Sequence, residues 1–242
     1  MNIYCNCSIE MIANLNKLNK FDYKFIYHPL INMELIQKYF PYLLDRQIYR
    51  LYYLKNLYSY WNTYVNLVSR KTFHDFYQQH VLFSLGIAKV FSFYPGSCVM
   101  DLGTGGGFPG IPLSIIFPKT KFILVDSIKK KIKIIEKIAY NLHLNNVHPI
   151  CIRAEKLENK FDFVVTRSVN KIDIIHDWIK DKFKYKSNSI IQNGAFYIKG
   201  GNLDDELKKF PNAIEYPLNH YFEEPFFGTK KVIWISNIEE KI

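Results

Sequence analysis

The stretch of residues 98–112 constrains the fold of this chain more than any other. It reads Cys-Val-Met-Asp-Leu-Gly-Thr-Gly-Gly-Gly-Phe-Pro-Gly-Ile-Pro, with glycines at alternate positions Gly103, Gly105 and Gly107 after Asp101. Glycine permits the positive φ of a tight turn and leaves room for a ligand against the backbone. Proline is favoured in the first turn of a helix. The stretch therefore predicts a strand, a glycine-rich turn and a helix N-terminus, which together form a nucleotide-binding βα unit.

The glycine spacing distinguishes two kinds of nucleotide site. Dinucleotide-binding enzymes usually carry G-x-G-x-x-G, with a pyrophosphate at the helix N-terminus. This chain has G-x-G-x-G, which resembles motif I of S-adenosylmethionine-dependent methyltransferases. About 20 residues on, an acid should meet the ribose hydroxyls, and the apolar run 121–125 ends at Asp126. The alternative is an ordinary tight turn with Asp126 as a helix cap, but strand, helix and acid in register favour the cofactor site.

The length and the cysteines restrict the class of protein. The 242 residues suffice for one large α/β domain with an N-terminal addition. No apolar run reaches the ~18 residues of a membrane span, and the start lacks the pattern of a secretory signal. Cys5 and Cys7 have no second ligand pair nearby, so no metal site is expected, and Cys98 and Cys151 fall in expected core strands. We expect a reduced, cytoplasmic, monomeric protein.

The net charge of +10 and a pI of about 9.2 suggest a polyanionic partner. The sequence is also dense in Lys, Asn, Ile and Tyr and poor in Arg. A drift in the nucleotide composition of the coding DNA also raises the lysine content of a protein, whatever the function of that protein. The charge therefore supports a nucleic-acid partner without establishing one.

The chain divides into three expected regions. Residues 1–32 have little regular pattern and are expected to form a loosely held extension, with Met33 as a possible alternative start. Residues 33–95 predict a helical cap that packs on the rest, including a helix over 73–91. The cap's apolar stripe is expected to contain Leu43, Ile48, Leu51, Leu54, Leu57, Tyr60 and Trp61. Residues 96–242 are expected to form the α/β domain.

Strand and helix patterns alternate through this α/β domain. Strands are expected at 97–102, 121–125, 149–153, 161–166, 194–199, 213–222 and 230–236, and helices at 109–117, 127–144, 172–183 and 203–210. The helix over 127–144 should bury Ile128, Ile132, Ile135, Ala139 and Leu142. Alternation that ends in a hairpin predicts a Rossmann-like sheet of seven strands with the last one antiparallel, as in class I methyltransferases.

Several motifs together resemble one bacterial family. The most specific covers residues 101–113, because Phe-Pro-Gly-Ile-Pro is rare after the glycines of other methyltransferases. Supporting matches are Trp61-Asn62 with Asn66-Leu67, Leu124-Val-Asp-Ser127 with Lys130-Lys131, Arg153-Ala-Glu155, Thr166-Arg-Ser168 and Lys199-Gly200. From about residue 33 to 236 the sequence resembles the RsmG (GidB) enzymes, which methylate N7 of a guanine in small-subunit 16S ribosomal RNA. The resemblance implies a Rossmann-like fold, S-adenosylmethionine as methyl donor and 16S ribosomal RNA as partner.

The resemblance also implies where the cofactor binds. By motif position, the contacts fall on Gly103, Phe108, Asp126, Ser127, Ile128, Ala154, Glu155 and Arg167. Asp126 would bind the ribose, Phe108 would form an apolar wall, and the pair 154–155 would flank the adenine. Arg167 would hold the cofactor carboxylate or an RNA phosphate, with a surface salt bridge as the alternative.

One motif departs from the family. The usual Arg-His-x-x-Asp-Ser stretch appears here as Gln-His-Val-Leu-Phe-Ser over residues 79–84, so it has lost the Arg and the Asp. We therefore assign substrate binding to other residues and expect His80 and His143 to pack or lie at the surface. The expected RNA contacts are Arg70, Lys71, Lys129, Lys130, Lys199, Lys230 and Lys231, although a lysine-rich helix is often only a solvated face.

The sequence identifies no catalytic side chain, and the chemistry explains why. Guanine N7 carries a free lone pair, so no proton must leave before it attacks an activated methyl group, and no Ser-His-Asp or Cys-His set is needed. A nicotinamide-dependent oxidoreductase is disfavoured by the glycine spacing. A non-catalytic RNA-binding protein on this fold would lack the cofactor residues, which are present. The nearest alternative is a methyltransferase acting on another RNA, a protein or a small molecule.

Overall fold

A seven-stranded sheet with the order β3-β2-β1-β4-β5-β7-β6 forms the centre of the protein. The computed structural model describes residues 29–167, 169–185 and 192–237. The strands are β1 (Cys98–Leu102), β2 (Lys121–Asp126), β3 (Val147–Cys151), β4 (Phe163–Arg167), β5 (Gly194–Gly200), β6 (Ile214–Pro217) and β7 (Lys230–Ser236). The first five are parallel, and β7 is antiparallel to both of its neighbours. The predicted sheet with its antiparallel last strand is confirmed.

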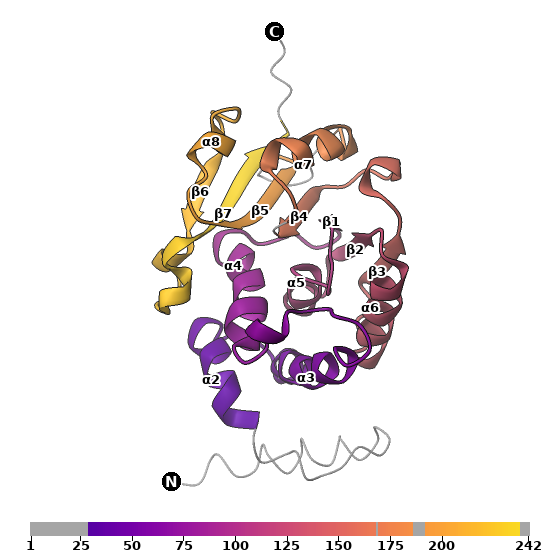
Figure 1. Ribbon diagram of the computed structural model, residues 1–242, viewed down its shortest axis with the longest axis vertical. Coiled ribbons are helices and arrows are strands. Elements are labelled where there is room, and N and C mark those ends of the chain that lie inside the picture. Colours follow the sequence, from indigo (N-terminus) through magenta and orange to yellow (C-terminus); the bar gives the residue numbers. More distant parts are fainter. Residues whose placement is uncertain (1–28, 168, 186–191, 238–242) are drawn as a thin grey trace.

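Helices cover both faces of this sheet (Figure 1). On one face lie α2 (Pro29–Tyr39), α3 (Asp45–Trp61), α4 (Phe83–Val90), α5 (Gly110–Ile116) and α6 (Lys129–Asn141), and on the other lie α7 (Ile172–Ile179) and α8 (Asp204–Leu207). Side chains alternate along the strands, so Val99 and Leu124 join the core under the first set, whereas Met100 and Ile123 join the core under α7. Burial on both faces explains the nearly continuous apolar runs of the parallel strands.

The N-terminal helices share one core with the sheet. Buried Leu51, Leu54 and Leu57 of α3 belong to the same cluster as Phe122 of β2, which confirms that the helical region packs on the α/β part. Tyr60 was expected on this apolar stripe, but it is 55% exposed, so that assignment is wrong. The possible start at Met33 falls inside α2. Most of the expected extension, with Cys5 and Cys7, lies outside the described residues.

The helix expected over residues 73–91 is instead two elements. A 3-10 turn at Arg70–Thr72 is followed by a π-helix at Tyr77–Leu82, which continues into α4. Apolar periodicity identifies a helix but does not report the wider hydrogen-bonded ring of a π-turn, so the π-helix was not predicted. Such turns are frequent at functional sites.

Other boundaries differ for local reasons. The expected strand over 213–222 stops at Pro217, because a 3-10 turn follows that buries Leu218 completely. The helix expected over 203–210 is the single turn α8. α6 begins at Lys129, so Ile128 is its N-cap residue and is 47% exposed rather than buried on its apolar face. Ile134 and Ile138 are buried on that face as well.

Candidate active site

The glycine-rich turn after β1 is closed on two sides and open on a third. Gly103 has φ +65°, and a Cβ there would lie 2.5 Å from Val169 Cγ2. A Cβ on Gly106 would lie 2.5 Å from the carbonyl oxygen of Leu67, in the segment after α3. A Cβ on Gly105, whose φ is +57°, would meet nothing closer than 3.8 Å. The turn is therefore a cradle whose open side is at Gly105.

Asp126 ties this turn to the end of β2. The backbone N–H of Gly105 donates to its Oδ2 at 2.9 Å, and the N–H of Ile128 donates to its Oδ1 at 2.8 Å. The carboxylate binds the backbone just before α6, whose N-cap residue is Ile128 and not Asp126, and its contact with the cofactor stays a prediction. A carboxylate can accept further hydrogen bonds while it keeps these two, since its two oxygens offer about four acceptor sites. Ser127 and Ile128 follow it on the exposed surface.

Asp101 organises the same turn from inside. Its carboxyl is fully buried, and Oδ2 accepts hydrogen bonds from the Thr104 hydroxyl at 2.5 Å and from the Gly110 N–H at 2.8 Å. Burial raises the pKa of Asp101 to about 7, against the opposing effects of these hydrogen bonds and of the Arg167 charge. Oδ1 has no hydrogen-bond partner within the part of the chain described here. The carboxyl therefore holds the turn and titrates near neutral pH.

The end of β3 supplies the third wall. A 3-10 turn at Ala154–Lys156 follows the strand, with Ala154 buried and Glu155 exposed. The buried Lys182 ammonium donates to the carbonyl oxygens of Glu155 at 3.4 Å and Leu157 at 2.7 Å, which fixes the backbone from behind. This turn offers backbone groups and one free carboxylate beside the end of β2.

Arg167, at the end of β4, is held by the π-helix. One guanidinium nitrogen donates to the Gln79 carbonyl oxygen, and the other lies near His80 Nδ1, both at 3.4 Å. The guanidinium carbon lies 4.9 Å from the centre of the Phe108 ring. Burial lowers the pKa of Arg167 to about 10, opposed by nearby Asp101 and Tyr58. Among the described residues no carboxylate lies within 4.0 Å of it, so the surface salt bridge is ruled out there.

His80 connects Arg167 to the 3-10 turn. Its Nε2 lies 2.8 Å from the Thr72 hydroxyl, which in turn donates to the carbonyl oxygen of Ser69 at 3.1 Å. These partners assign the imidazole proton to Nε2 and leave Nδ1 as an acceptor for Arg167. Burial, and secondarily the Arg167 charge, lower the pKa of His80 to about 4. His80 is 8% exposed and is a neutral packed histidine, as predicted, but its contact with Arg167 was not foreseen.

Tyr58 joins α3 to the glycine turn and was missed by sequence reasoning. Its hydroxyl donates to the carbonyl oxygen of Gly106, and its ring lies 5.0 Å from that of Phe108. Phe108 is 2% exposed and also packs near Phe76 and His80, so its side chain lies in the interface with the N-terminal helices. A cofactor contact of Phe108 therefore stays a prediction. The only sequence signal for Tyr58 is its place one residue after Leu57 on a helix that buries both.

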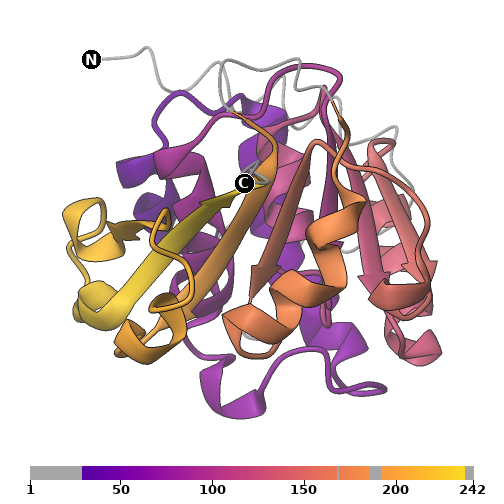
Figure 2. The ribbon, with the colours of Figure 1, turned by 90° about the horizontal axis from the view of Figure 1, so that it is seen from above.

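The four strand ends that carry these groups are adjacent in the sheet. The order β3-β2-β1-β4 brings together the 154–156 turn, Asp126, the glycine turn and Arg167. Ligands of open α/β sheets bind outside the carboxyl ends of the strands. In Figure 2 the purple segment that follows α3 passes beyond the arrowheads of the parallel strands, on the same side as these residues. A carboxylate for a diol, an open glycine turn and a cationic side chain suit S-adenosylmethionine.

The basic residues expected to contact RNA fall into two groups. Arg70, Lys71, Lys129 and Lys130 are exposed, and Arg70 and Lys71 line a hollow of about 340 Å³ with Asn66 and Ser69. The others already have partners within the protein. Lys199 pairs with Glu206 at 3.0 Å, Lys231 pairs with Glu215 at 2.6 Å, and Lys230 lies 5.0 Å from the Phe226 ring centre.

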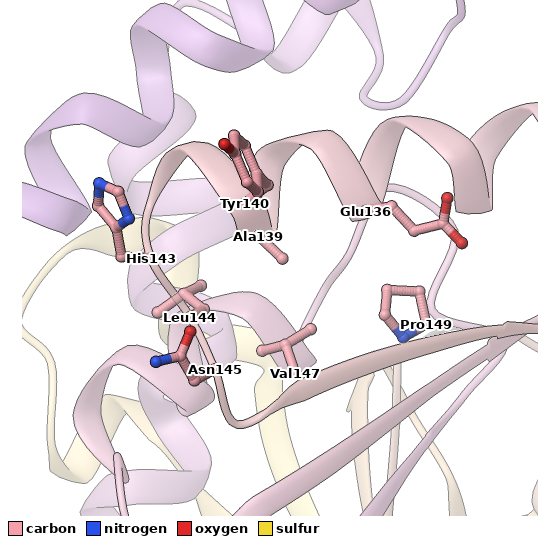
Figure 3. A pocket seen from close by; sticks show the side chains of 8 residues that line it. All are labelled: Glu136, Ala139, Tyr140, His143, Leu144, Asn145, Val147 and Pro149. Carbon is pink, nitrogen blue, oxygen red and sulfur yellow. The ribbon is translucent and has the colours of Figure 1, made fainter. Parts of the chain in front are cut away.

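A second hollow of about 360 Å³ lies away from this region (Figure 3). It is formed by the last turns of α6, the following turn and the start of β3, and is lined by residues that include Glu136, Tyr140 and His143. The start of a parallel strand is at the edge opposite the candidate site. Neither a cluster of metal-ligating residues nor a helix able to cross a membrane occurs in the part of the chain that the structure describes.

Comparison with known proteins decides the family. The GidB family model, described as rRNA small subunit methyltransferase G, matches residues 42–229. The chain belongs to this family. Proteins named ribosomal RNA small subunit methyltransferase G from Flavobacterium johnsoniae and Cytophaga hutchinsonii are 49% and 45% identical to it. The first comparison covers 83% of this chain and 96% of the relative, and the second covers 84% and 99%.

Likeness to solved structures is weaker than likeness to the family. A SAM-dependent methyltransferase from Aquifex aeolicus is 16% identical, with a TM-score of 0.47 over 64% of this chain and 89% of that one. A likeness at this level supports no statement about function. Family membership therefore rests on the sequence comparisons, and the fold rests on the sheet order described above.

Proposed function

We propose that this protein transfers the methyl group of S-adenosylmethionine to N7 of a guanine in the 16S ribosomal RNA of the small subunit. Membership of the family supports the reaction and the substrate class. The geometry adds one observation: Asp126 binds the open side of the glycine turn through Gly105 N–H, at the end of β2. A carboxylate beside an uncovered backbone turn at the strand ends supports a nucleoside site there.

The residues around the strand ends then take distinct roles. Gly103 and Gly105 let the turn approach the methionine part, and Asp126 accepts hydrogen bonds from the ribose hydroxyls. Ser127 and Ile128 border the ribose and adenine, and Ala154 and Glu155 flank the adenine through backbone and carboxylate. Phe108 supplies apolar backing behind the turn. Arg167 binds an anion, either the cofactor carboxylate or an RNA phosphate.

The reaction requires positioning more than proton transfer. When bound, S-adenosylmethionine supplies a methyl group activated by its sulfonium. The residues at the strand ends would hold this group with its methyl carbon facing the N7 lone pair of guanine, so that transfer would leave a neutral thioether and a positively charged purine. Asp101, whose raised pKa of about 7 is close to neutral, is buried and hydrogen-bonded within the protein. Holding donor and acceptor in line can supply roughly 7–11 kcal/mol of the barrier.

The test is a methylation assay with a mapped product. Purified protein is incubated with labelled S-adenosylmethionine and small subunits from a strain that lacks this modification, and the labelled nucleotide is then identified. We expect label on N7 of one guanine in the 16S RNA. Label on another RNA, on a protein or on a small molecule would support the alternative methyltransferase. Binding of the cofactor without transfer to any of these would remove the proposed substrate.

The remaining expectations are part of the same proposal. A site built by one chain is compatible with action as a monomer, which sedimentation of the purified protein tests. We also propose that the reaction takes place in the cytoplasm, which a ribosomal substrate supports. The division at residues 32 and 95 also stays a proposal. Expression of residues 33–242 would test whether the chain folds and binds cofactor without its first 32 residues.

A further inference from the structure

Three aromatic side chains cluster on the surface where α3 ends. The ring centres of Tyr60 and Trp61 lie 4.9 Å apart, those of Tyr60 and Tyr64 5.4 Å, and those of Trp61 and Tyr64 5.9 Å. Tyr60 is 55% and Tyr64 is 66% exposed. Burial of a large aromatic surface stabilises proteins and their complexes. These rings pack on one another but keep part of their surface in solvent, and a ligand could bury that surface. We call Tyr60, Trp61 and Tyr64 the aromatic trio.

A row of lysines lies beside the aromatic trio. Lys130, Lys133 and Lys137 follow one another at three- and four-residue steps on α6 and so share a face of that helix. The Lys137 ammonium lies 4.7 Å from the Trp61 ring centre, and Figure 1 shows α3 and α6 side by side. All three lysines are exposed. The row runs from the trio toward Ile128 and the candidate cofactor site.

The charge around the trio has one sign. Residues 55–74 contain no Asp or Glu, but they contain Lys55, Arg70 and Lys71. In α6 the only acid is Glu136, which lines the hollow of Figure 3. A surface that combines exposed aromatic rings with exposed cations is complementary to single-stranded nucleic acid, in which bases stack on rings and phosphates meet lysines.

The trio is connected directly to the glycine turn. Asn62 lies between Trp61 and Tyr64 in the chain, and its side chain binds the backbone of Leu67 and Val68, with distances of 2.8 to 3.2 Å. The carbonyl of Leu67 in turn packs on Gly106, as described above. Asn66, Ser69 and the two basic residues after them, which flank Leu67 and Val68 in the chain, line a hollow. A strand of RNA lying on the trio would therefore lead into the site.

We propose that the aromatic trio, flanked by Lys133 and Lys137, is a stacking platform for an unpaired base of the RNA substrate next to the methylated guanine. The proposal rests on the proposed function for the identity of that RNA. Stacking fixes the RNA near the site, whereas the lysines supply the salt-dependent part of the affinity. The platform proposal therefore assigns RNA recognition to the aromatic trio, Lys133 and Lys137, which are not among the RNA contacts expected from the sequence.

The double variant Tyr60→Ser with Tyr64→Ser tests the platform. Binding is measured with oligoadenylate and oligouridylate of equal length, because adenine stacks more strongly than uracil. We expect the variant to bind oligoadenylate about tenfold more weakly and to lose the preference for it, with an unchanged dependence on salt. Lys133→Gln with Lys137→Gln should instead reduce the logarithmic salt slope by up to about 1.4, since each phosphate contact on a single strand contributes about 0.7. The KM for small subunits should rise in both.

Tyr42→Ser is the matched control. Tyr42 is also 66% exposed, but it precedes α3, at the opposite end of that helix. Circular dichroism and the Kd for S-adenosylmethionine should be those of the wild type in every variant. Unchanged oligoadenylate binding in the trio variant, or an equal loss in the control, would overturn the platform. A raised KM for subunits with normal oligonucleotide binding would show that the surface contacts a ribosomal protein instead.

Failure of the proposed function gives a different result. If the wild-type protein methylates no ribosomal RNA, the reaction is wrong, yet its preference for oligoadenylate and the effect of the trio variant can still be measured. If it methylates the RNA but the trio variant has a wild-type KM and wild-type oligonucleotide affinity, the platform alone is wrong.

Discussion

The two sides of the candidate site are built in different ways. On the side of β2, Asp126 binds Gly105 and Ile128 through exposed or partly buried hydrogen bonds between neighbouring strand ends. On the side of β4, Arg167 lies over Phe108 and is held by groups of the π-helix from the N-terminal region. The first side belongs to the α/β sheet alone. The second exists only because the N-terminal helices dock on it.

Because of this difference, the β2 side is expected to determine cofactor affinity and the β4 side to determine turnover and stability. The β2 side offers free acceptor capacity and an open turn, so changes there should act on cofactor affinity. The β4 side is buried and joined to the segment that carries Arg70 and Lys71, so changes there should act on turnover and on stability. Variants of the two sides can therefore be ranked by what they affect and by how much.

The largest expected effect is that of Asp126→Ala. It would remove the proposed acceptor for the ribose hydroxyls, together with the hydrogen bonds to Gly105 and Ile128, so cofactor binding should fall below detection in calorimetry. The circular dichroism spectrum should be unchanged, because the bonds lost are at the surface. Asp205→Ala, whose side chain is 93% exposed, is the control. Unchanged cofactor affinity in Asp126→Ala would remove this residue from the site.

Arg167→Gln should have the next largest effect. The variant keeps hydrogen-bond donors but loses the charge, and loss of one electrostatic contact in an active site typically lowers turnover about 100-fold. If Arg167 binds the cofactor carboxylate, only the Kd for the cofactor should rise. If it binds an RNA phosphate, only the Kd for RNA should rise. Arg46→Gln, at the exposed start of α3, should behave as the wild type. Wild-type turnover in Arg167→Gln would show that the guanidinium only packs on Phe108.

The sequence predicted the backbone elements of the β2 side but not the contacts of the β4 side, for a physical reason. The glycine turn and Asp126 are specified by backbone chemistry within about 25 residues of chain, so their type and spacing can be recognised. The contacts of Arg167 join residues 87 and 88 positions apart, and that of Tyr58 spans 48. Such contacts depend on how helices dock. The π-helix and the exposure of Ile128 were missed because periodicity does not record ring size or the start of α6.

Opposite pH effects of two buried groups provide a finer test. Asp101 has a raised pKa of about 7, so between pH 4 and 7 the folded protein keeps a proton that the unfolded chain releases, and acidification stabilises it. His80 has a lowered pKa of about 4, so between pH 6.5 and 4 the unfolded chain takes up a proton that the folded protein does not, and acidification destabilises it. The two contributions oppose each other in the wild type.

Single substitutions should separate them. As the pH falls from 7 to 4, Asp101→Asn should lose stability relative to the wild type, and His80→Gln should gain it. At about 1.4 kcal/mol per pKa unit, the limits are roughly 4 and 3 kcal/mol. Urea unfolding at several pH values measures both, with His220→Gln, on the exposed surface, as control. Curves that stay parallel to the wild type would show that neither group titrates differently in the folded protein.

The smallest effect, from Tyr58→Phe, tests whether the two sides are independent. The substitution keeps the ring against Phe108 and removes only the hydrogen bond to the buried carbonyl of Gly106. Loss of such a bond costs about 1 kcal/mol, or about 2–4 °C in Tm for a chain of this size. Tyr185→Phe, at a 98% exposed tyrosine, should change nothing. If the N-terminal helices only support the turn from behind, cofactor affinity should change less than about threefold. A loss as large as that of Asp126→Ala would mean that the turn has no binding geometry of its own and acquires it from the docked helices.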